Sequence, residues 1–273
     1  MTSDVLLAVN FRPVYDDIRR NLPSALLLTG ADGIGLTTIA RSLSTNVEEL
    51  LQPQNKKGEI DVTGGSISVE AVRDLYRFTR GQNPAGAQII IADADRMTKS
   101  AQQAFLKLLE EPPRGVSFIL TSHRDVELLP TIRSRVQRVI VPPISSEDSR
   151  QLVSKSKLDS ETERQLLFVA QGRPGMLTKL SQNPKELRRM VELVRDARDL
   201  VSGNTSAKLS ICYRYNDRGQ TLTLLDSAIS LIEFSLISHP EPSSILSATR
   251  LMDAYRNIVT GGNVRLNVLA TVL

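Results

Sequence analysis

Four short apolar segments in the first half of the chain alternate with stretches of helical periodicity. The segments read ALLLT at 25–29, AQIIIADA at 87–94, VSFILTS at 116–122 and RVQRVIV at 135–141. Strands that are apolar along their whole length are typical of a sheet that is buried on both faces. When such strands alternate with helices, the sheet is mainly parallel and the helices cover it. The sequence therefore predicts an α/β fold with a parallel sheet for this part of the chain.

Helical spacing of apolar residues joins these expected strands over 36–51, 68–81 and 98–113. Ser68 and Thr98 stand before two of the patterns, where a hydroxyl side chain caps the first turn of a helix. A pair of prolines ends the third segment and stops its helix. We therefore expect three helices to pack against the sheet.

The second half of the chain shows no further convincing strand. Ser145 and Asp148 resemble a capping box, with Asp in place of Glu or Gln, and open a helical region that runs to about residue 180. After the break QNP at 182–184, helical patterns cover 185–202, about 220–238 and 243–272. The expected domains are an α/β domain at 1–142, a small helical domain at 143–182 and an all-helical domain at 183–273.

The composition is that of an ordinary folded protein and narrows the class of function only slightly. Of 273 residues, 41% are apolar and 23% are charged, and the net charge is +4. This mild positive charge is compatible with nucleic acid binding and equally with a solvated basic surface. A single cysteine, Cys212, excludes disulfides and cysteine-based zinc sites within the chain. The start of the chain is not that of a signal peptide and no apolar run spans a bilayer, so we expect a cytoplasmic protein.

The segment GADGIGLTT at 30–38 follows the first expected strand and precedes a helix. In this context Walker-A loops, G-x-x-x-x-G-K-[ST], bind phosphate through backbone N–H groups at a helix N-terminus. The residues of this degenerate loop are Gly30, Gly33, Gly35, Leu36 and Thr37. Leu36 stands where the motif requires lysine. Two interpretations are open: a phosphate loop that has lost its cation, or a tight turn that binds no ligand.

Two further segments are uncommon, AFLKLLEEPP at 104–113 and IRSRV at 132–136. Together with the loop and with GGSISVEAVRDL at 64–75, they resemble the delta-prime subunits of bacterial DNA polymerase III clamp loaders, of the AAA+ superfamily. The resemblance covers residues 20–180 well and 254–273 more weakly. It implies an AAA+ α/β domain with a small helical lid, followed by an all-helical collar domain that serves oligomerisation.

The resemblance also implies that this chain does not hydrolyse ATP by itself. The Walker-B acids of the family align with Ala92 and Asp93, which removes the expected Mg²⁺ ligand and shortens the expected base by one methylene. The sensor-2 arginine aligns with Gly175, and Arg173 lies two residues away. Together with Leu36 these are three separate defects in one site. Weak ATP or ADP binding without turnover stays open.

Two cationic features are implied to act on phosphate groups. Arg135 corresponds to the arginine that reaches the ATP of a neighbouring subunit in this family, where a fixed guanidinium supports hydrolysis in trans. Without the resemblance it is an ordinary surface arginine. The helix start at Arg96, Thr98, Lys99 and Ser100 corresponds to helix ends that line the central chamber of the family and contact DNA. Helix capping alone explains the same hydroxyl residues.

Two other positions complete the comparison with the resembled family. Its sensor-1 region corresponds to Thr121 and Ser122, and His123 after them is expected to be a loop residue. A four-cysteine zinc module that is common in the family has no counterpart, because residues 50–65 contain no cysteine. We therefore expect no zinc and no other metal cofactor.

These implications combine into one expected function. The chain would be a non-hydrolysing clamp-loader subunit that completes the loader ring, supplies Arg135 in trans and helps to load the sliding clamp onto primed DNA during replication. Its partners would be motor ATPase and delta-like subunits, primer–template DNA and, indirectly, the sliding clamp, with no membrane. The alternatives are an active clamp-loader ATPase of the gamma/tau-like motor type and a stand-alone AAA+ protein that binds nucleotide or DNA.

Overall fold

The computed structural model describes residues 7–62, 64–79, 86–154, 158–238 and 242–272. The chain divides into two compact units, each with a hydrophobic core of its own. The first unit comprises Met1–Glu163 and Ala170–Ser181, and the second comprises Arg164–Val169 and Gln182–Leu273. The three domain boundaries expected from the sequence stay a prediction, since most of the expected lid segment clusters with the α/β part.

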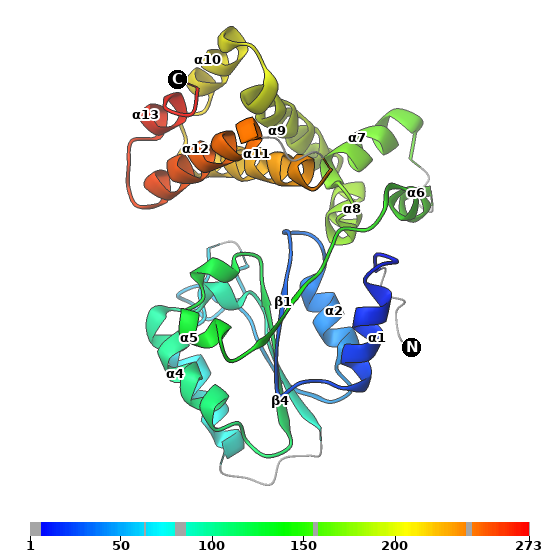
Figure 1. Ribbon diagram of the computed structural model, residues 1–273, viewed down its shortest axis with the longest axis vertical. Coiled ribbons are helices and arrows are strands. Elements are labelled where there is room, and N and C mark those ends of the chain that lie inside the picture. Colours follow the sequence, from blue (N-terminus) through cyan, green and yellow to red (C-terminus); the bar gives the residue numbers. More distant parts are fainter. Residues whose placement is uncertain (1–6, 63, 80–85, 155–157, 239–241, 273) are drawn as a thin grey trace. The chain divides into compact units, whose positions relative to one another are not determined.

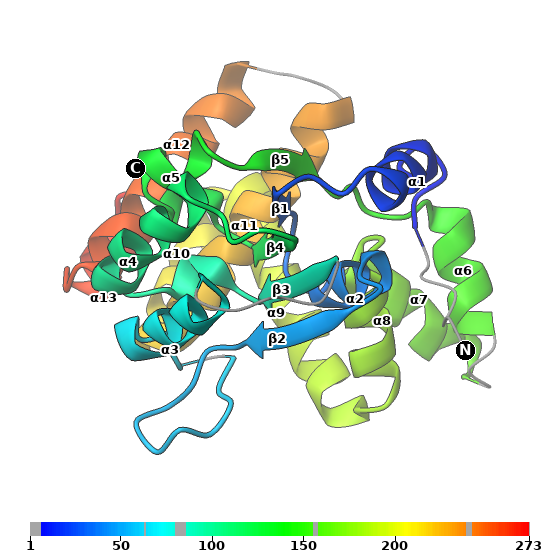
Figure 2. The same cartoon turned by 90° about the horizontal axis from the view of Figure 1, so that it is seen from below.

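Within the described residues, a five-stranded parallel sheet forms the centre of the first unit (Figures 1 and 2). Its strands are β1 (Ala25–Thr29), β2 (Val47–Leu51), β3 (Ala87–Ile91), β4 (Val116–Ser122) and β5 (Gln137–Ile140). The order across the sheet is β2-β3-β4-β1-β5, and all neighbouring strands are parallel. The three middle strands are almost entirely buried, which explains their continuous apolar sequences. All carboxyl ends of the strands therefore meet at one edge of the sheet.

Helices cover both faces of this sheet (Figure 1). On one face lie α1 (Arg12–Arg20) and α2 (Leu36–Leu43), and on the other lie α4 (Lys99–Glu110) and α5 (Pro130–Arg133). α3 (Val69–Asp74) runs into the 3₁₀ helix η1 (Leu75–Thr79) and packs against α4. Phe105 of α4 meets Phe118 of β4 edge to face, with ring centroids 5.2 Å apart. Ser68 and Thr98 cap α3 and α4 with their hydroxyl oxygens, as predicted.

Three helices follow the sheet: α6 (Ser146–Ser154), α7 (Ser160–Ala170) and α8 (Pro174–Ser181). The capping box predicted before α6 is confirmed, since Ser145 Oγ accepts from the Asp148 backbone N at 3.0 Å and donates to its carboxylate at 2.7 Å. α6 packs against α8. The Ile144 backbone N also donates to the Gly172 carbonyl at 2.9 Å, which ties the start of this segment to the turn before α8.

The second unit is helical throughout its described residues. Its helices after α7 are α9 (Pro184–Ser202), α10 (Thr205–Arg214), α11 (Arg218–Ser238), α12 (Pro242–Val259) and α13 (Val264–Leu269). α11 packs against α9 and α12, and the core between them contains Leu224, Leu225 and Ala228, all fully buried. Among the described helices of the whole chain, none is both long and apolar enough to cross a membrane.

The structure corrects the predicted elements at two places in the first unit. The helix expected over 36–51 ends at Leu43, and residues 47–51 form the edge strand β2. Gln88 of β3 explains the break, because its Oε1 accepts hydrogen bonds from the backbone N of Thr45 at 2.7 Å and of Asn46 at 3.1 Å. These bonds draw the chain onto the edge of the sheet. The strand expected over 135–141 begins only at Gln137, after the short α5.

Two other predicted helices differ in detail, and one observed helix was not predicted. The helix expected over 68–81 is an α-helix only as far as Asp74, and residues 80–85 lie outside the described residues. The last predicted helix, 243–272, is divided into α12 and α13, because the chain turns at Gly261, whose φ of 104° favours glycine. α10 lies between two predicted helices and was not predicted.

Candidate functional site

The glycine-rich loop connects β1, the strand between β4 and β5, to α2 at the carboxyl edge of the sheet. Gly35 is the N-cap of α2 and has a φ of 93°, a conformation that side chains other than glycine rarely adopt. Gly30 passes so close to the strand end that an added Cβ would lie 2.9 Å from the Val141 carbonyl oxygen. The backbone path therefore explains both glycines whether or not a ligand binds.

Leu36 at the lysine position of the loop is a core residue. It is the first residue of α2 and is only 2% exposed. Ile34 and Ile39 beside it are also buried, whereas Thr37 is half-buried. The loop therefore has an apolar side chain packed beneath it where a phosphate loop has a cation.

The residues aligned with Walker B and sensor 1 lie at the ends of the two adjacent middle strands. Ala92 follows β3 and is buried, and Asp93 after it adopts a left-handed backbone with φ of 52°. The Asp93 backbone N donates to Thr121 Oγ1 of β4 at 3.0 Å. Ser122 is fully buried at the end of β4, and its Oγ accepts from the Arg124 backbone N at 3.2 Å. The structure thus brings these four predicted positions to the edge at which the loop lies.

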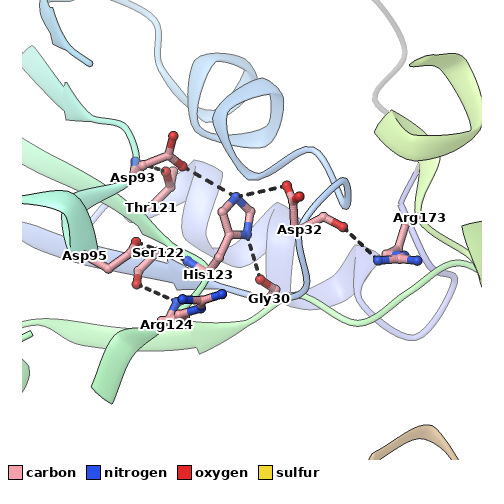
Figure 3. A network of polar contacts seen from close by, with 9 residues as sticks. All are labelled: Gly30, Asp32, Asp93, Asp95, Thr121, Ser122, His123, Arg124 and Arg173. Carbon is pink, nitrogen blue, oxygen red and sulfur yellow. Dashed lines mark hydrogen bonds and ion pairs between the residues drawn. The ribbon is translucent and has the colours of Figure 1, made fainter. Parts of the chain in front are cut away.

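His123 is the centre of a polar network at this edge (Figure 3). Its Nδ1 lies 2.9 Å from the Gly30 carbonyl oxygen, and its backbone N donates to Asp95 Oδ1 at 3.3 Å. Its Nε2 lies 3.5 Å from Asp93 Oδ1 and 3.9 Å from Asp32 Oδ1. His123 is a loop residue, as expected, but sequence reasoning gave it no role. The sequence signal that could have identified it is its position directly after β4, the strand that lies between β3 and β1.

The electrostatics of this network do not favour a bare polyphosphate. Asp32, Asp93 and Asp95 all place carboxylate oxygens around the His123 residue. Burial raises the pKa of Asp93, whose side chain is 15% exposed, and the nearby His123 offsets this rise only in part. The described residues at this edge therefore present carboxylates without the lysine that a phosphate loop supplies.

The turn before α8 and the first turn of α8 contact the loop from its other side. The Met176 backbone N donates to the Gly33 carbonyl at 3.0 Å, and the Arg173 guanidinium donates to the Asp32 carbonyl at 3.3 Å. Gly175, at the expected sensor-2 position, lies so close that an added Cβ would be 2.8 Å from the Gly33 carbonyl oxygen. This close approach leaves no room for the sensor-2 side chain, and Arg173 is used instead to hold the backbone of the loop.

The sequence predicted Arg135 at the start of a strand. In the structure it lies in the turn between α5 and β5. Its Nη2 is 3.1 Å from Glu110 Oε1, and its Nη1 donates to the Thr131 carbonyl at 3.0 Å. The side chain remains 39% exposed. Val136, which follows it, packs against the core of the sheet. The backbone is thus anchored while the guanidinium is held only by surface contacts.

The start of α4 presents three exposed residues, Thr98, Lys99 and Ser100. Thr98 Oγ1 accepts from the Ala101 backbone N at 3.1 Å and lies 3.2 Å from Ser100 Oγ. Arg96 is half-buried, and its guanidinium donates to the Gly65 carbonyl at 3.5 Å. Capping by Thr98 is therefore observed, and the ammonium of Lys99 is the exposed cation of this helix end.

Across the described residues, no three His, Cys, Asp or Glu side chains are grouped so that they could hold a metal ion.

Comparison with known proteins shows similarity to subunits of the replication machinery. Residues 18–145 match the sequence model of the family described as DNA polymerase III, delta subunit. The chain is 24% identical over 188 residues to the DNA polymerase III subunit delta' of Haemophilus influenzae, covering 59% of this chain and 58% of that protein. It is also 24% identical over 284 residues to the replication factor C small subunit of Thermoplasma acidophilum, covering 90% and 85% of the two chains.

A solved structure resembles the whole fold. It is a DNA polymerase III gamma subunit-related protein of Thermotoga maritima, with 17% identity and a TM-score of 0.51 over 96% of this chain and 97% of that one. The predicted fold class is confirmed to the extent of a parallel-sheet α/β domain with surrounding helices, followed by a largely helical region. The predicted resemblance to delta-prime subunits is likewise confirmed.

Proposed function

We propose that the chain is a non-hydrolysing subunit of a clamp-loader ring, and the match of residues 18–145 to the DNA polymerase III delta-subunit family model supports this proposal. It completes the ring, supplies Arg135 to the ATP of a neighbouring subunit and helps to load the sliding clamp onto primed DNA. Because the match spans 58% of the Haemophilus protein, the role of the whole chain is inferred from the site rather than from that relative.

The observation that carries the proposal is the burial of Leu36, which is 2% exposed at the lysine position of the loop. A charge-assisted hydrogen bond to a phosphate contributes about 1.5–3 kcal/mol, and an apolar side chain contributes none of this. Ala92 cannot bind Mg²⁺, and the metal clamp on the phosphates is lost with it. The same two residues oppose the alternative of an active motor ATPase.

Arg135 supports the trans role through its exposure and its weak anchoring. Its contact with Glu110 joins two partly exposed groups, at 39% and 51%, and such a pair contributes about 0.2–1 kcal/mol. The guanidinium can therefore leave Glu110 for a phosphate at little cost. Its planar fork and permanent charge suit a γ-phosphate better than an ammonium does. An ordinary surface ion pair is the alternative explanation of the same geometry.

The start of α4 supports a contact with the DNA backbone. Lys99 is exposed in the first turn of a twelve-residue helix, where the backbone N–H groups and the helix dipole favour an anion. Such a contact is independent of base sequence and becomes weaker as salt concentration rises. This is what a protein that acts on any primed site requires.

Assembly with other loader subunits is supported by the surface of α12. Ile245, Met252 and Val259 recur at intervals of seven residues, which places them on one face of the helix, and all three are exposed. Apolar side chains that are aligned in this way are typical of a helix that packs against another chain. We propose that residues 183–273 carry contacts with the neighbouring subunits through this face.

The experiment that tests the proposal compares the chain alone with the assembled loader. The purified full chain should hydrolyse ATP at background rate, and it should co-elute with motor and delta-like subunits in size-exclusion chromatography. The mixture should then load the clamp on primed DNA. A magnesium-dependent rate near one per second by the chain alone, on the order of a typical slow enzyme, supports the motor ATPase instead. Failure to co-elute with any loader subunit supports a stand-alone AAA+ protein.

A further inference from the structure

His123 bridges the segments that meet at the remnant phosphate loop. In the sheet, β4 lies between β3 and β1, so the residue that follows β4 stands between the ends of its two neighbours. His123 directly follows Ser122, the last residue of β4. Asp93 lies just beyond β3, and Gly30 lies just beyond β1. The strand order thus puts this imidazole between the loop and the Walker-B position.

The contacts of the ring use both of its nitrogens (Figure 3). The Gly30 carbonyl can only accept a hydrogen bond, so Nδ1 carries the hydrogen of the 2.9 Å contact between them. Nε2 faces two carboxylates, Asp93 at 3.5 Å and Asp32 at 3.9 Å, an arrangement that is attractive when the ring is protonated. The side chain is 26% exposed. The ring therefore connects the first and third residues of the loop to the end of β3.

The loop is held from its other side as well. The carbonyl of Asp32 accepts from Arg173, and the carbonyl of Gly33 accepts from the Met176 backbone N. The Ala31 carbonyl accepts from the Ile34 backbone N at 3.2 Å, so with the bond from His123 to Gly30 the carbonyl groups of all four residues 30–33 have partners in the protein. These bonds fix the path of the loop without a ligand.

We propose that His123 is the residue that closes the remnant loop to nucleotides, by bridging Gly30 to Asp93 across the place where phosphates would enter. The inference rests on the proposed function, because it assumes that the loop descends from an AAA+ phosphate loop. It adds a cause for nucleotide exclusion that is separate from the missing lysine. Loss of the cation weakens the site, whereas the imidazole closes it.

Removal of the ring opens the loop and frees the Asp93 carboxylate. A loop that is open in one molecule in about ten binds its ligand about tenfold more weakly than a loop that is always open. His123→Ala should therefore bind Mg·ADP at least about tenfold more tightly than the wild type does. ADP without Mg²⁺ should not gain affinity, because Asp32 and Asp93 then face the phosphates with no cation between them.

The test uses titration of the full chain with ADP, in the presence and absence of Mg²⁺, by calorimetry. His123→Asn serves as the conservative variant, because its amide keeps a donor near the position of Nδ1 and should leave the affinity within threefold of the wild type. Lys57→Ala, which removes an exposed cation from another loop, is the matched control. Amide hydrogen exchange at residues 30–36 should become faster in His123→Ala than in the wild type, the asparagine variant and the control.

The inference is overturned if folded His123→Ala gains no affinity for Mg·ADP, or if the wild type already binds it as tightly. It is equally overturned if the asparagine variant gains as much affinity as the alanine variant. Each of these results leaves the proposed function standing, provided that the wild-type chain still assembles with loader subunits and lacks turnover. Conversely, failure to assemble refutes the loader role and leaves the measured effect of His123 on the loop intact.

Discussion

Replacement of Leu36 by lysine restores the consensus sequence of the Walker-A motif, yet we expect it to destabilise the protein. Leu36 is 2% exposed, and one of its methyl groups packs near Gly30 at the start of the loop. Burial of a leucine side chain contributes about 1.5–3 kcal/mol, which the variant loses. An ammonium that stays buried adds a desolvation cost, although a lysine can reduce it when its flexible stem reaches water.

The expected loss is therefore about 3 kcal/mol or more in the stability of the first unit. At about 2–4 °C per kcal/mol for a unit of this size, the melting temperature should fall by about 6–12 °C. Thermal and urea unfolding measure this loss. Leu36→Met is the matched control, because a swap that conserves volume costs less than about 1.5 kcal/mol. ATP turnover should not appear in the lysine variant, since Ala92 still supplies no metal ligand.

Two results would refute this reasoning. If Leu36→Lys is as stable as Leu36→Met without nucleotide, position 36 is not a packed position and the side chain already points out of the core. If Mg·ATP raises the melting temperature of the lysine variant well above that of the wild type, the loop still binds nucleotide and lacks only its cation. Either result would favour the interpretation that this is a recently inactivated ATPase site.

Three further predictions address pH, DNA and assembly. Burial raises the pKa of Asp93, so ionisation of this carboxyl opposes folding. Asp93→Asn should therefore match the stability of the wild type below about pH 4, where the carboxyl is protonated. As the pH rises, the melting temperature of the variant should increase relative to that of the wild type until the Asp93 carboxyl is fully ionised. Lys99→Ala should lower the slope of log affinity against log salt by about 0.9 in the assembled loader if one phosphate contact is lost. Met252→Glu should abolish co-elution with loader subunits at unchanged melting temperature, whereas Asp253→Ala should not.

The sequence predicts the middle of the sheet well, because burial on both faces makes a strand continuously apolar. The predicted strands at 25–29 and 116–122 coincide with β1 and β4. β2 is an edge strand with the sequence VEELL, and its apolar residues happen to continue the spacing of α2. Its place in the sheet depends on distant contacts, namely the parallel ladder with β3 and the hydrogen bonds from Thr45 and Asn46 to Gln88, more than 40 residues away.

The candidate site shows the same division between local and distant causes. The loop and its helix are visible in the sequence because strand, glycines and helix are contiguous. The contact between His123 and Gly30 joins residues 93 positions apart, and it depends on the order of the strands. No local pattern encodes that order. A rule that the residues after neighbouring parallel strands meet at one edge would have drawn attention to His123 once the strand order was known.

The most direct test of the central claim is the ATPase and clamp-loading activity of a reconstituted loader in which Arg135→Ala is the only change. Arg133→Ala is the matched control, since it removes an exposed guanidinium two residues earlier in the same segment. We expect intact assembly, reduced DNA-stimulated turnover and a larger loss of clamp loading, because an arginine finger contributes about 10³-fold or more at the site that it serves. Arg135→Lys should not restore either activity. Wild-type turnover and loading by the assembled Arg135→Ala complex would show that Arg135 is an ordinary surface charge.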